Sequence, residues 1–258
     1  LYREQAQGLL AGGVDFFVIE TMLDIQEARA AILAVRELCD LPVCVSMTFD
    51  QSGRTLTGTD PITALITLQS LGADAVGCNC STGPSDMIKV IAAMKPYAKV
   101  PLPAKPNAGL PKLIDGKTIF DLSAQEFGGY VADFIKAGVN LFGGCCGTSP
   151  DYIAQIKKHA LGHKPLAPCP QRFSAVTSAR KTVFIGREIP IVVVGERINP
   201  TGKKRLQAEL KEGKTAEVRR LASEQLSQGA CVLDVNVGMP GIDEQAMMMK
   251  MVELLSPV

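Results

Sequence analysis

The chain has 258 residues, of which 27 are basic and 26 are acidic, so its formal net charge is only +1. This balance argues against nucleic acid or an anionic membrane as a partner, because both are recognised through clustered positive charge. No apolar run approaches the roughly 18 residues that a membrane span requires, and no targeting segment opens the chain. Eight cysteines in a chain of this length indicate reduced thiols rather than a disulfide framework. We therefore expect a cytoplasmic globular protein.

A short pattern recurs along the chain and predicts parallel β/α units. A helical stretch ends at a glycine, and a small residue then leads into an apolar run, at Gly13, Gly72, Gly138 and Gly229. Glycine suits the left-handed position after a helix, and a parallel strand covered on both faces is almost continuously apolar. The strands expected along the chain are Phe16–Glu20, Val43–Phe49, Ala75–Cys80, Leu102–Lys105, Leu141–Cys145, Ile191–Gly195 and Val232–Val237.

The helices between these strands carry start signals. Asp24 and Ser123 each precede a glutamate by three residues, which is the spacing of a capping box. Pro61 and Pro150 stand where a first helical residue is expected, a position that proline favours. A further helix is expected from about Ala216 to Gln228. Strands that alternate with helices imply right-handed β/α units around a parallel sheet.

The stretch 161–189 is expected to be a linker, because Pro165, Pro168 and Pro170 interrupt a segment of weak periodicity. It separates a module at residues 1–160 from a second module at residues 190–258. About five β/α units precede the linker and two follow it, whereas a TIM-type (β/α)8 barrel has eight. The expected fold class is therefore α/β, with two TIM-type barrels in tandem that are both incomplete in this chain.

Three cysteines follow the predicted strands. Cys80 closes one strand, and the adjacent Cys145 and Cys146 close another. In a parallel α/β barrel this edge is the functional face. Three thiolates with one open position would form a catalytic zinc site, where a substrate thiol would lose its proton to the metal. Cysteine is also a common small core residue, and spacing alone leaves that alternative open. Cys78 is a weaker, spare candidate ligand, because alternation along the strand would point it to the same face as Cys80.

The segments around these cysteines carry a specific resemblance. Gly-Cys-Asn-Cys at 77–80, Pro-Asn-Ala-Gly at 106–109 and Gly-Gly-Cys-Cys-Gly-Thr at 143–148 resemble the ordered signature of homocysteine S-methyltransferases. The resemblance implies an enzyme that binds zinc and presents it to the sulfur of L-homocysteine. The implied zinc ligands are Cys80, Cys145 and Cys146.

The same resemblance implies contacts to the rest of the substrate. Glu20 would meet the ammonium group of homocysteine, for which a carboxylate is the natural counter-charge. Ser46 and Asn79 match family positions near the substrate. From the residues alone, Glu20 could instead cap a loop, Ser46 could be a core hydroxyl and Asn79 could brace a turn.

Polar residues also stand near the strand ends of the second module. Asp234 and Asn236 alternate onto one face of their strand, where a carboxylate and an amide could pair with the edge of a flat heterocycle. Inward polar residues of a barrel can also simply satisfy one another. Gly-Glu-Arg-Ile-Asn at 195–199 and Asp-Val-Asn-Val-Gly at 234–238 resemble pterin-binding methyltransferase domains, which bind methyltetrahydrofolate. This resemblance implies that Asn199, Asp234 and Asn236 contact the pterin.

The order of the two modules resembles that of the cobalamin-dependent methionine synthase family. This resemblance implies methyl transfer from methyltetrahydrofolate through cobalamin to zinc-bound homocysteine, with cobalamin held by a domain beyond Val258. One alternative is a methyltransferase that uses betaine or S-methylmethionine directly, and another is a homocysteine barrel fused to a methylenetetrahydrofolate reductase. The pterin-like segments argue against both. A third alternative, a non-catalytic zinc-binding barrel, stays open.

Overall fold

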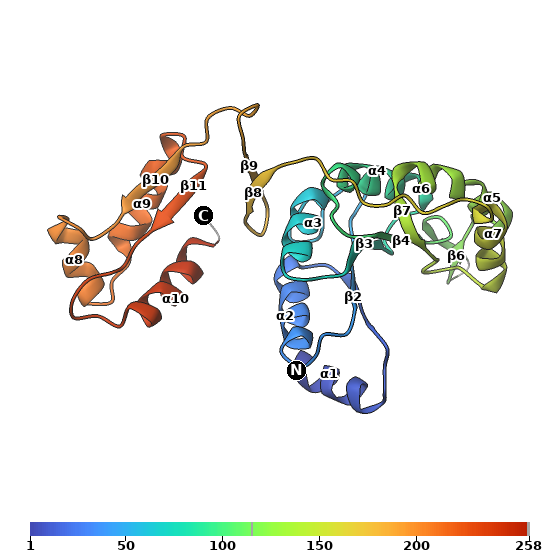
Figure 1. Cartoon of the computed structure of the whole chain (residues 1–258), viewed down its shortest axis with the longest axis horizontal. Coiled ribbons are helices and arrows are strands. Elements are labelled where there is room, and N and C mark those ends of the chain that lie inside the picture. Colours follow the sequence, from blue (N-terminus) through green and yellow to red (C-terminus); the bar gives the residue numbers. More distant parts are fainter. Residues whose placement is uncertain (115, 257–258) are drawn as a thin grey trace. The chain divides into compact units, whose positions relative to one another are not determined.

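The computed structural model describes residues 1–114 and 116–256, which form two compact units (Figure 1). The first unit consists of Leu1–Arg172 with Ala179–Lys181, and the second of Phe173–Ser178 with Thr182–Val258. Each unit has an apolar core of its own. Among the described residues, no helix has both the length and the apolar character needed to cross a membrane.

The first unit is built on a five-stranded sheet in which every neighbouring pair of strands is parallel. The strands lie in the order β1 (Phe17–Met22), β2 (Val43–Met47), β3 (Ala75–Asn79), β4 (Leu102–Lys105) and β7 (Val139–Phe142). The helices of the unit are α1 (Tyr2–Ala11), α2 (Ile25–Arg36), α3 (Pro61–Ser70), α4 (Pro84–Met94), the 3-10 helix η1 (Lys95–Tyr97), α5 (Ala124–Gly129), α6 (Val131–Ala137) and α7 (Pro150–Ala160). This parallel α/β architecture is the one expected from the sequence.

Helices cover one face of this sheet, and the core of the first unit lies between the two layers (Figure 1). Helix α2 shows how the sequence produces this packing. Its residues Ile25, Ala28, Ile32 and Val35 recur at helical spacing and are buried together with Val45 of β2. Full burial of each larger apolar side chain contributes roughly 1.5–3 kcal/mol. The helices therefore occupy one face and leave the opposite face, here called the inner face, for other roles.

The register of the strands determines which side chains share the inner face. Ser46 pairs with Gly77, and Asn79 pairs with Lys105. These residues alternate with the core residues of their strands, so they point away from the helices. A side chain on Gly77 would not fit, because its Cβ would lie 1.9 Å from the carbonyl oxygen of Pro103. Glycine at this position allows β3 and β4 to approach closely.

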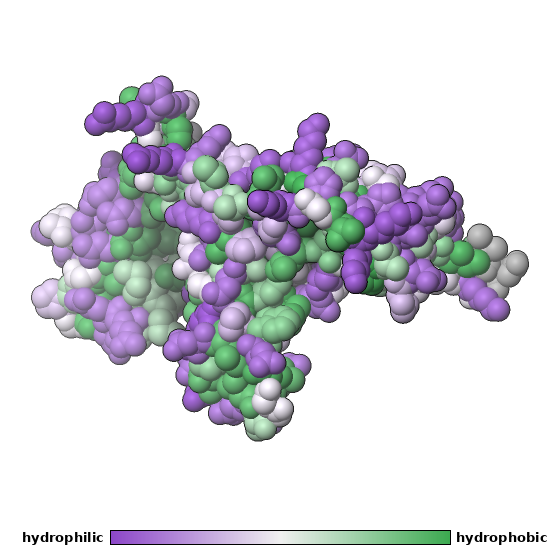
Figure 2. All heavy atoms as spheres, turned by 45° about the vertical axis from the view of Figure 1, so that its right-hand side comes forward, coloured by the Kyte–Doolittle hydropathy of each residue, from purple (hydrophilic) through white to green (hydrophobic). Residues whose placement is uncertain are grey.

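Apolar side chains at the surface gather near α1, toward the bottom of Figure 2. Strand β1 forms one edge of the sheet, so among the described residues it has a strand neighbour on one side only. Phe16 is 57% exposed and Val18 is 46% exposed, whereas Phe17 and Ile19 are buried. The alternation shows that one side of β1 faces the helices and the other does not.

The predicted helix starts agree with the structure at all four positions, Asp24 included, whose side chain accepts from the Gln26 amide. The Ser123 side chain accepts a hydrogen bond from the Glu126 amide, and the Glu126 side chain accepts one from the Ser123 amide. This capping box is therefore confirmed. Pro61 and Pro150 both lie in the first turns of their helices. The capping box expected at Asp24 is wrong in one half, because its glutamate accepts a hydrogen bond from the Tyr2 hydroxyl instead.

The predicted strand ends are accurate at β4 and shifted elsewhere. The prediction Leu141–Cys145 begins two residues and ends three residues too late, because Val139 already pairs with Leu102 and β7 ends at Phe142. The prediction Ile191–Gly195 is wrong by three, since β10 (Val194–Ile198) carries the pairing. The apolar run that begins at Ile191 suggested a buried strand, but Ile191 is 94% exposed, whereas Ile198 is almost fully buried.

Two antiparallel hairpins were not expected from the sequence. The first joins β5 (Pro111–Ile114) to β6 (Lys117–Phe120), and the second joins β8 (Ser174–Thr177) to β9 (Thr182–Ile185). The second hairpin lies within the stretch 161–189 that was predicted as a linker. Prolines in that stretch obscured the strand signal. The module boundaries at 160 and 190 stay a prediction.

The second unit contains a parallel pair of strands, β10 and β11 (Val232–Val235), with three helices. The helices are α8 (Lys204–Lys211), α9 (Ala216–Ser227) and α10 (Glu244–Leu255). Leu206, Val218, Leu221 and Met251 bring all three helices into one core with Ile198 of β10. The arrangement is again of parallel β/α type, and closure of either unit into a tandem barrel stays a prediction.

Candidate metal centre

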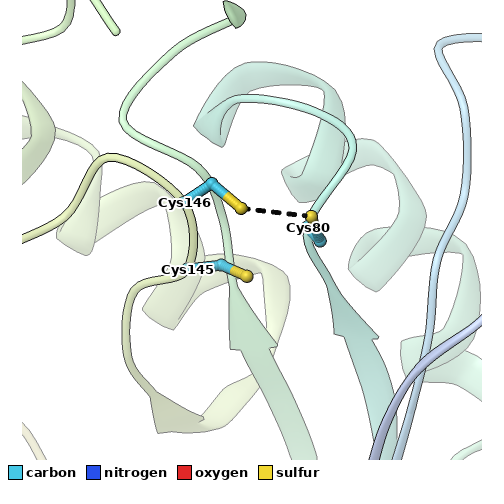
Figure 3. A group of neighbouring side chains, drawn as sticks. All are labelled: Cys80, Cys145 and Cys146. Carbon is cyan, nitrogen blue, oxygen red and sulfur yellow. Dashed lines mark hydrogen bonds between the residues drawn. The ribbon is translucent and has the colours of Figure 1, made fainter. Parts of the chain in front are cut away.

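Three cysteine thiols meet at the carboxyl edge of the first unit's sheet. Cys80 follows β3, while Cys145 and Cys146 stand in the loop after β7 (Figure 3). Their sulfur atoms all lie within 4.8 Å of one another, and the sulfur atoms of Cys80 and Cys146 are 3.6 Å apart. Sixty-five residues of sequence separate Cys80 from Cys145, so the fold alone brings these side chains together.

Strand β4 holds both cysteine segments in place. It lies between β3 and β7, and parallel strands end at the same edge of the sheet. The Cys80 amide donates to the carbonyl of Lys105 at 3.1 Å, and the Cys145 amide donates to the carbonyl of Pro106 at 2.9 Å. Two consecutive carbonyl groups at the end of β4 therefore position the two sides of the site.

The turn at Cys80 has an uncommon backbone conformation. Cys80 and Ser81 both have φ angles of 63°, in the left-handed region that costs residues other than glycine roughly 1–2 kcal/mol. The amide of Thr82 donates to the carbonyl of Cys80 at 2.7 Å and closes the turn. This conformation ends the alternation of β3, so Cys80 does not point to the same face as Cys78.

Cys78 illustrates the consequence. It is 2% exposed within the apolar core, and burial raises the pKa of its thiol well above the ordinary value. Simple alternation along the strand predicted that Cys78 and Cys80 would share a face. The structure shows that they do not, and Cys78 is a core residue rather than a spare ligand.

The loop that carries Cys145 and Cys146 is braced by polar contacts. The amide and hydroxyl of Thr148 donate to the carbonyl of Cys145 at 3.2 and 2.7 Å. The amide of Cys146 donates to the side chain of Asn107 at 3.0 Å. Gly144 makes this tight loop possible, because a Cβ there would lie 2.5 Å from the Thr148 hydroxyl oxygen. Neither Asn107 nor Thr148 received a role from the sequence, although both stand in the signature segments.

The three thiols fit a zinc ion with one open position. In a tetrahedron with zinc–sulfur bonds of about 2.3 Å, neighbouring sulfur atoms are about 3.8 Å apart, close to the separation of Cys80 and Cys146. The hydrogen bond with Cys80, burial and the neighbouring Cys145 raise the pKa of Cys146 to about 11. A thiol of this pKa is protonated at neutral pH, and a bound dication would favour its thiolate form.

Asn79 links the site to β1. Its side chain donates to the Thr21 hydroxyl at 2.7 Å and accepts from the Thr21 amide at 2.8 Å. It also donates to the sulfur of Cys145 at 3.7 Å. Thr21 itself has a φ angle of 61°, at an irregularity in the pairing of β1 with β2. Asn79 thus ties the end of β3 to the irregular end of β1 and also touches a thiol, and its place near a substrate stays a prediction.

The other expected substrate contacts of the first unit lie on the same edge. Glu20 forms an ion pair with Lys105, a residue to which the sequence had assigned no role. The Ser46 hydroxyl is fully buried and has no hydrogen-bond partner within the described chain. Buried polar atoms are rarely left unsatisfied, so an unpartnered hydroxyl at this place is unusual.

The pterin contacts expected in the second unit are placed at the ends of its two strands. Asp234 and Asn236 line an open depression of about 440 Å³ together with Glu244 and Met248 of α10. The side chain of Asn236 accepts from the Gly238 amide at 2.7 Å. Asp234 and Asn236 therefore both border this depression, and their contact with a pterin stays a prediction.

Asn199 is held differently. It follows β10, donates to Glu196 at 2.6 Å and accepts from the Thr201 amide at 3.0 Å. These bonds within its own loop leave its role toward a ligand as a prediction.

Comparison with known proteins agrees with this geometry. The sequence model of the family described as homocysteine S-methyltransferase matches residues 1–160, more than half of the chain. The chain belongs to the homocysteine S-methyltransferase family. Proteins similar to this chain include the methionine synthases of Mycobacterium tuberculosis, strain H37Rv, and Mycobacterium leprae. The first is 30% identical over 94% of this chain and the second 31% identical over 93%. In both cases the match covers 21% of the relative, so this chain spans about a fifth of their length.

Solved structures of one homocysteine methyltransferase share the fold of more than half of this chain. The homocysteine methyltransferase MmuM from Escherichia coli matches in its apo form with a TM-score of 0.50 and 23% identity. This match covers 61% of the present chain and 56% of the other. Its metallated form gives a TM-score of 0.51 at 22% identity, over 61% and 50% of the two chains. At this identity the likeness supports the parallel α/β fold of the family.

Proposed function

We propose that this chain activates homocysteine for methylation, forming methionine. The observation that carries the proposal is the group of three thiols at Cys80, Cys145 and Cys146, which converge at the carboxyl edge of the sheet. Zinc bound by these thiolates would supply the positive charge that keeps the homocysteine sulfur deprotonated at neutral pH. The deprotonated sulfur would then form the new bond to the methyl carbon while the bond between that carbon and its donor breaks, and the donor would keep the electron pair of the broken bond.

The residues around the thiols would hold the ligands and the substrate in position. The bonds from Asn107 and Thr148 fix the loop of Cys145 and Cys146, so the site is shaped by the protein itself. Asn79 would orient Cys145 through its amide. Glu20 would bind the ammonium of homocysteine, and the unpartnered Ser46 hydroxyl would meet a polar substrate atom. Such positioning of two reacting groups is itself a large part of catalysis.

We propose methyltetrahydrofolate as the methyl donor, with cobalamin as carrier on a further domain. Two observations support this donor. The match to methionine synthases covers 94% of the chain, whereas the family model ends at residue 160, so the similarity extends into the second unit. There Asp234 and Asn236 present a carboxylate and an amide to an open depression, which suits the polar edge of a pterin. Asn199 would contribute from the neighbouring strand end.

Two other functions remain testable for the same site. A donor such as betaine or S-methylmethionine needs only the first unit, so removal of Asp234 and Asn236 would leave its use unaffected. A non-catalytic zinc protein would bind the metal and show no change in its coordination with homocysteine.

The deciding experiment is zinc X-ray absorption on the purified chain, with and without L-homocysteine. We expect three sulfur neighbours at about 2.3 Å, rising to four when homocysteine binds. Four sulfur neighbours before addition and no response afterwards would contradict the proposal and indicate a closed structural site. Absence of stoichiometric zinc would also contradict it for this chain. The donor is tested separately by calorimetric titration of methyltetrahydrofolate into the wild-type chain and into the Asp234→Asn and Asn236→Ala variants.

A further inference from the structure

The inner face of the sheet carries an ion pair beside the metal centre. Lys105, at the end of β4, donates to the carboxylate of Glu20 on β1, so the pair extends past the two strands between them. The side chain of Lys105 is 24% exposed and that of Glu20 is 50% exposed. Both charged groups are therefore open to an entering ligand while they remain partly shielded from water.

The backbone places this lysine next to the thiols. Lys105 pairs with Asn79 in the sheet, and its carbonyl accepts the amide of Cys80 at 3.1 Å. A molecule whose sulfur occupied the open position of the metal centre would thus have its other end near the ion pair. Gly143 leaves room for the lysine stem, because a Cβ there would lie 3.2 Å from its Cγ atom.

Strand β2, which lies between β1 and the other strands, supplies a second indication that a ligand binds beside the ion pair. The pKa of the Cys44 thiol is raised by burial, and both Lys105 and Glu20 act on it, so their charges lie close to β2. Two residues further along the same face, the Ser46 hydroxyl is fully buried and unpartnered in the described chain. A built polar site with an unsatisfied hydroxyl points to a polar ligand.

We propose that Lys105 is a specificity-determining residue that binds the α-carboxylate of the thiol substrate while Glu20 binds its ammonium. This inference rests on the proposed function and extends it to the recognition of the amino-acid end. The ion pair of the free protein has one cation and one anion, and a zwitterion brings the opposite charge to each. The substrate exchanges the internal pair for two new charge-assisted bonds, which are stronger than neutral ones.

This arrangement selects for a thiol that carries both charges. A thiol without a carboxylate competes with Lys105 for Glu20 and offers nothing to the lysine in return. A thiol without an ammonium meets the reverse problem. The ion pair thus discriminates against simple thiols, which zinc alone would bind without preference.

The test is calorimetric binding of three thiols to the zinc-loaded full chain and its variants. The ligands are L-homocysteine, mercaptobutyrate, which lacks the ammonium, and homocysteamine, which lacks the carboxylate. Lys105→Met should weaken homocysteine and mercaptobutyrate by about ten- to a hundredfold, the usual range for one bond to a charged group. Homocysteamine should bind equally well or more tightly, because Glu20 is then free of its lysine. Lys105→Arg should recover most of the loss.

Lys89→Met, which removes an exposed lysine on α4, serves as the matched control and should change none of the affinities. Equal weakening of all three thiols by Lys105→Met, or no weakening of homocysteine, would overturn the role of Lys105. Thermal unfolding of each variant shows whether it is folded, and a Lys105→Arg protein that binds homocysteine no better than Lys105→Met also contradicts the proposal. Failure of the wild-type chain to bind any thiol at zinc would instead reject the proposed function itself.

Discussion

Cys80 can reach the other two thiols because its backbone leaves the extended conformation of β3. Its φ angle of 63° turns the side chain out of the alternation that buries Cys78. Strained residues of this kind persist only where the surroundings hold them, and here the Lys105 carbonyl and the Thr82 amide do so. The left-handed backbone conformation of Cys80 thus decides whether a third thiol can reach the candidate metal site.

Replacing Cys80 by serine should remove most of the zinc affinity. Two thiolates would remain, and we expect a loss of more than about a hundredfold, since even residues that only support a ligand change metal affinity by about 10- to 100-fold. Zinc content after dialysis against a metal buffer measures the effect. Cys169→Ser removes an exposed thiol outside the site and should retain full zinc. Equal zinc in both variants would show that Cys80 is not a ligand.

At the scale of secondary-structure elements, the close approach of β3 and β4 is the feature on which the site depends. Gly77→Ala would place a Cβ 1.9 Å from the Pro103 carbonyl oxygen and force these strands apart. We expect a loss of about 1–3 kcal/mol in the free energy of unfolding, as for other overpacked positions, together with weaker zinc binding. Urea denaturation and zinc titration measure the two effects.

Gly8→Ala in α1 is the matched control for this substitution. A Cβ at Gly8 meets no atom within 4 Å, and alanine favours a helix interior by up to about 1 kcal/mol. This variant should be as stable as the parent or more so. If Gly77→Ala behaved in the same way, the strand contact would not be limiting.

Sequence patterns predicted those parts of the fold that depend on local or periodic signals. The glycine-to-strand pattern at Gly13, Gly72, Gly138 and Gly229 precedes β1, β3, β7 and β11, and the ordered cysteine segments predicted the convergence of Cys80, Cys145 and Cys146 that the structure displays. The ion pair of Glu20 with Lys105 could not be predicted, because it depends on side chains that meet across intervening strands. The shift of β10 had another cause, since the apolar residue Ile191 lies outside the strand and is exposed.

Helix α9 contributes a pH-dependent element to the second unit. Glu217 is 8% exposed, receives two bonds from Arg220 at 2.9 and 2.8 Å and pairs with Arg205 at 3.2 Å. The hydrogen bonds from Arg220 lower the pKa of Glu217 below its ordinary value of 4.5. The folded unit then binds fewer protons than the unfolded chain, so this stabilisation is present above pH 4.5 and is lost as the pH falls through the lowered pKa.

Glu217→Gln should therefore reduce the stability of the second unit by about 1 kcal/mol at neutral pH and flatten its acid dependence. Hydrogen exchange of the α9 amides, corrected for the intrinsic effect of pH, measures both. Glu224→Gln removes a more exposed partner of the same arginine and should have a smaller effect. An unchanged acid profile in Glu217→Gln would show that another group titrates.

At the scale of the whole molecule, the chain consists of two units with separate cores, and the thiols belong entirely to the first. The turns that carry the thiols are held by bonds within the protein, from Lys105, Pro106 and Asn107. We therefore expect removal of zinc by a chelator to leave the far-ultraviolet circular dichroism spectrum unchanged. Small zinc domains behave in the opposite way, because their folding free energy comes from the metal. Loss of helical signal on chelation would contradict this expectation.

The hydrogen bonds from the end of β4 also allow folding of the chain and loading of the metal to be separate events. Because β4 positions both turns through hydrogen bonds of its own, we expect that synthesis and folding need not wait for the zinc supply of the cell. If zinc binds as proposed, folded protein can be loaded with the metal when zinc becomes plentiful, and a passing shortage would halt the proposed chemistry while the fold is kept. Late metallation of this kind would make the site a reporter of metal availability as well as a place for catalysis.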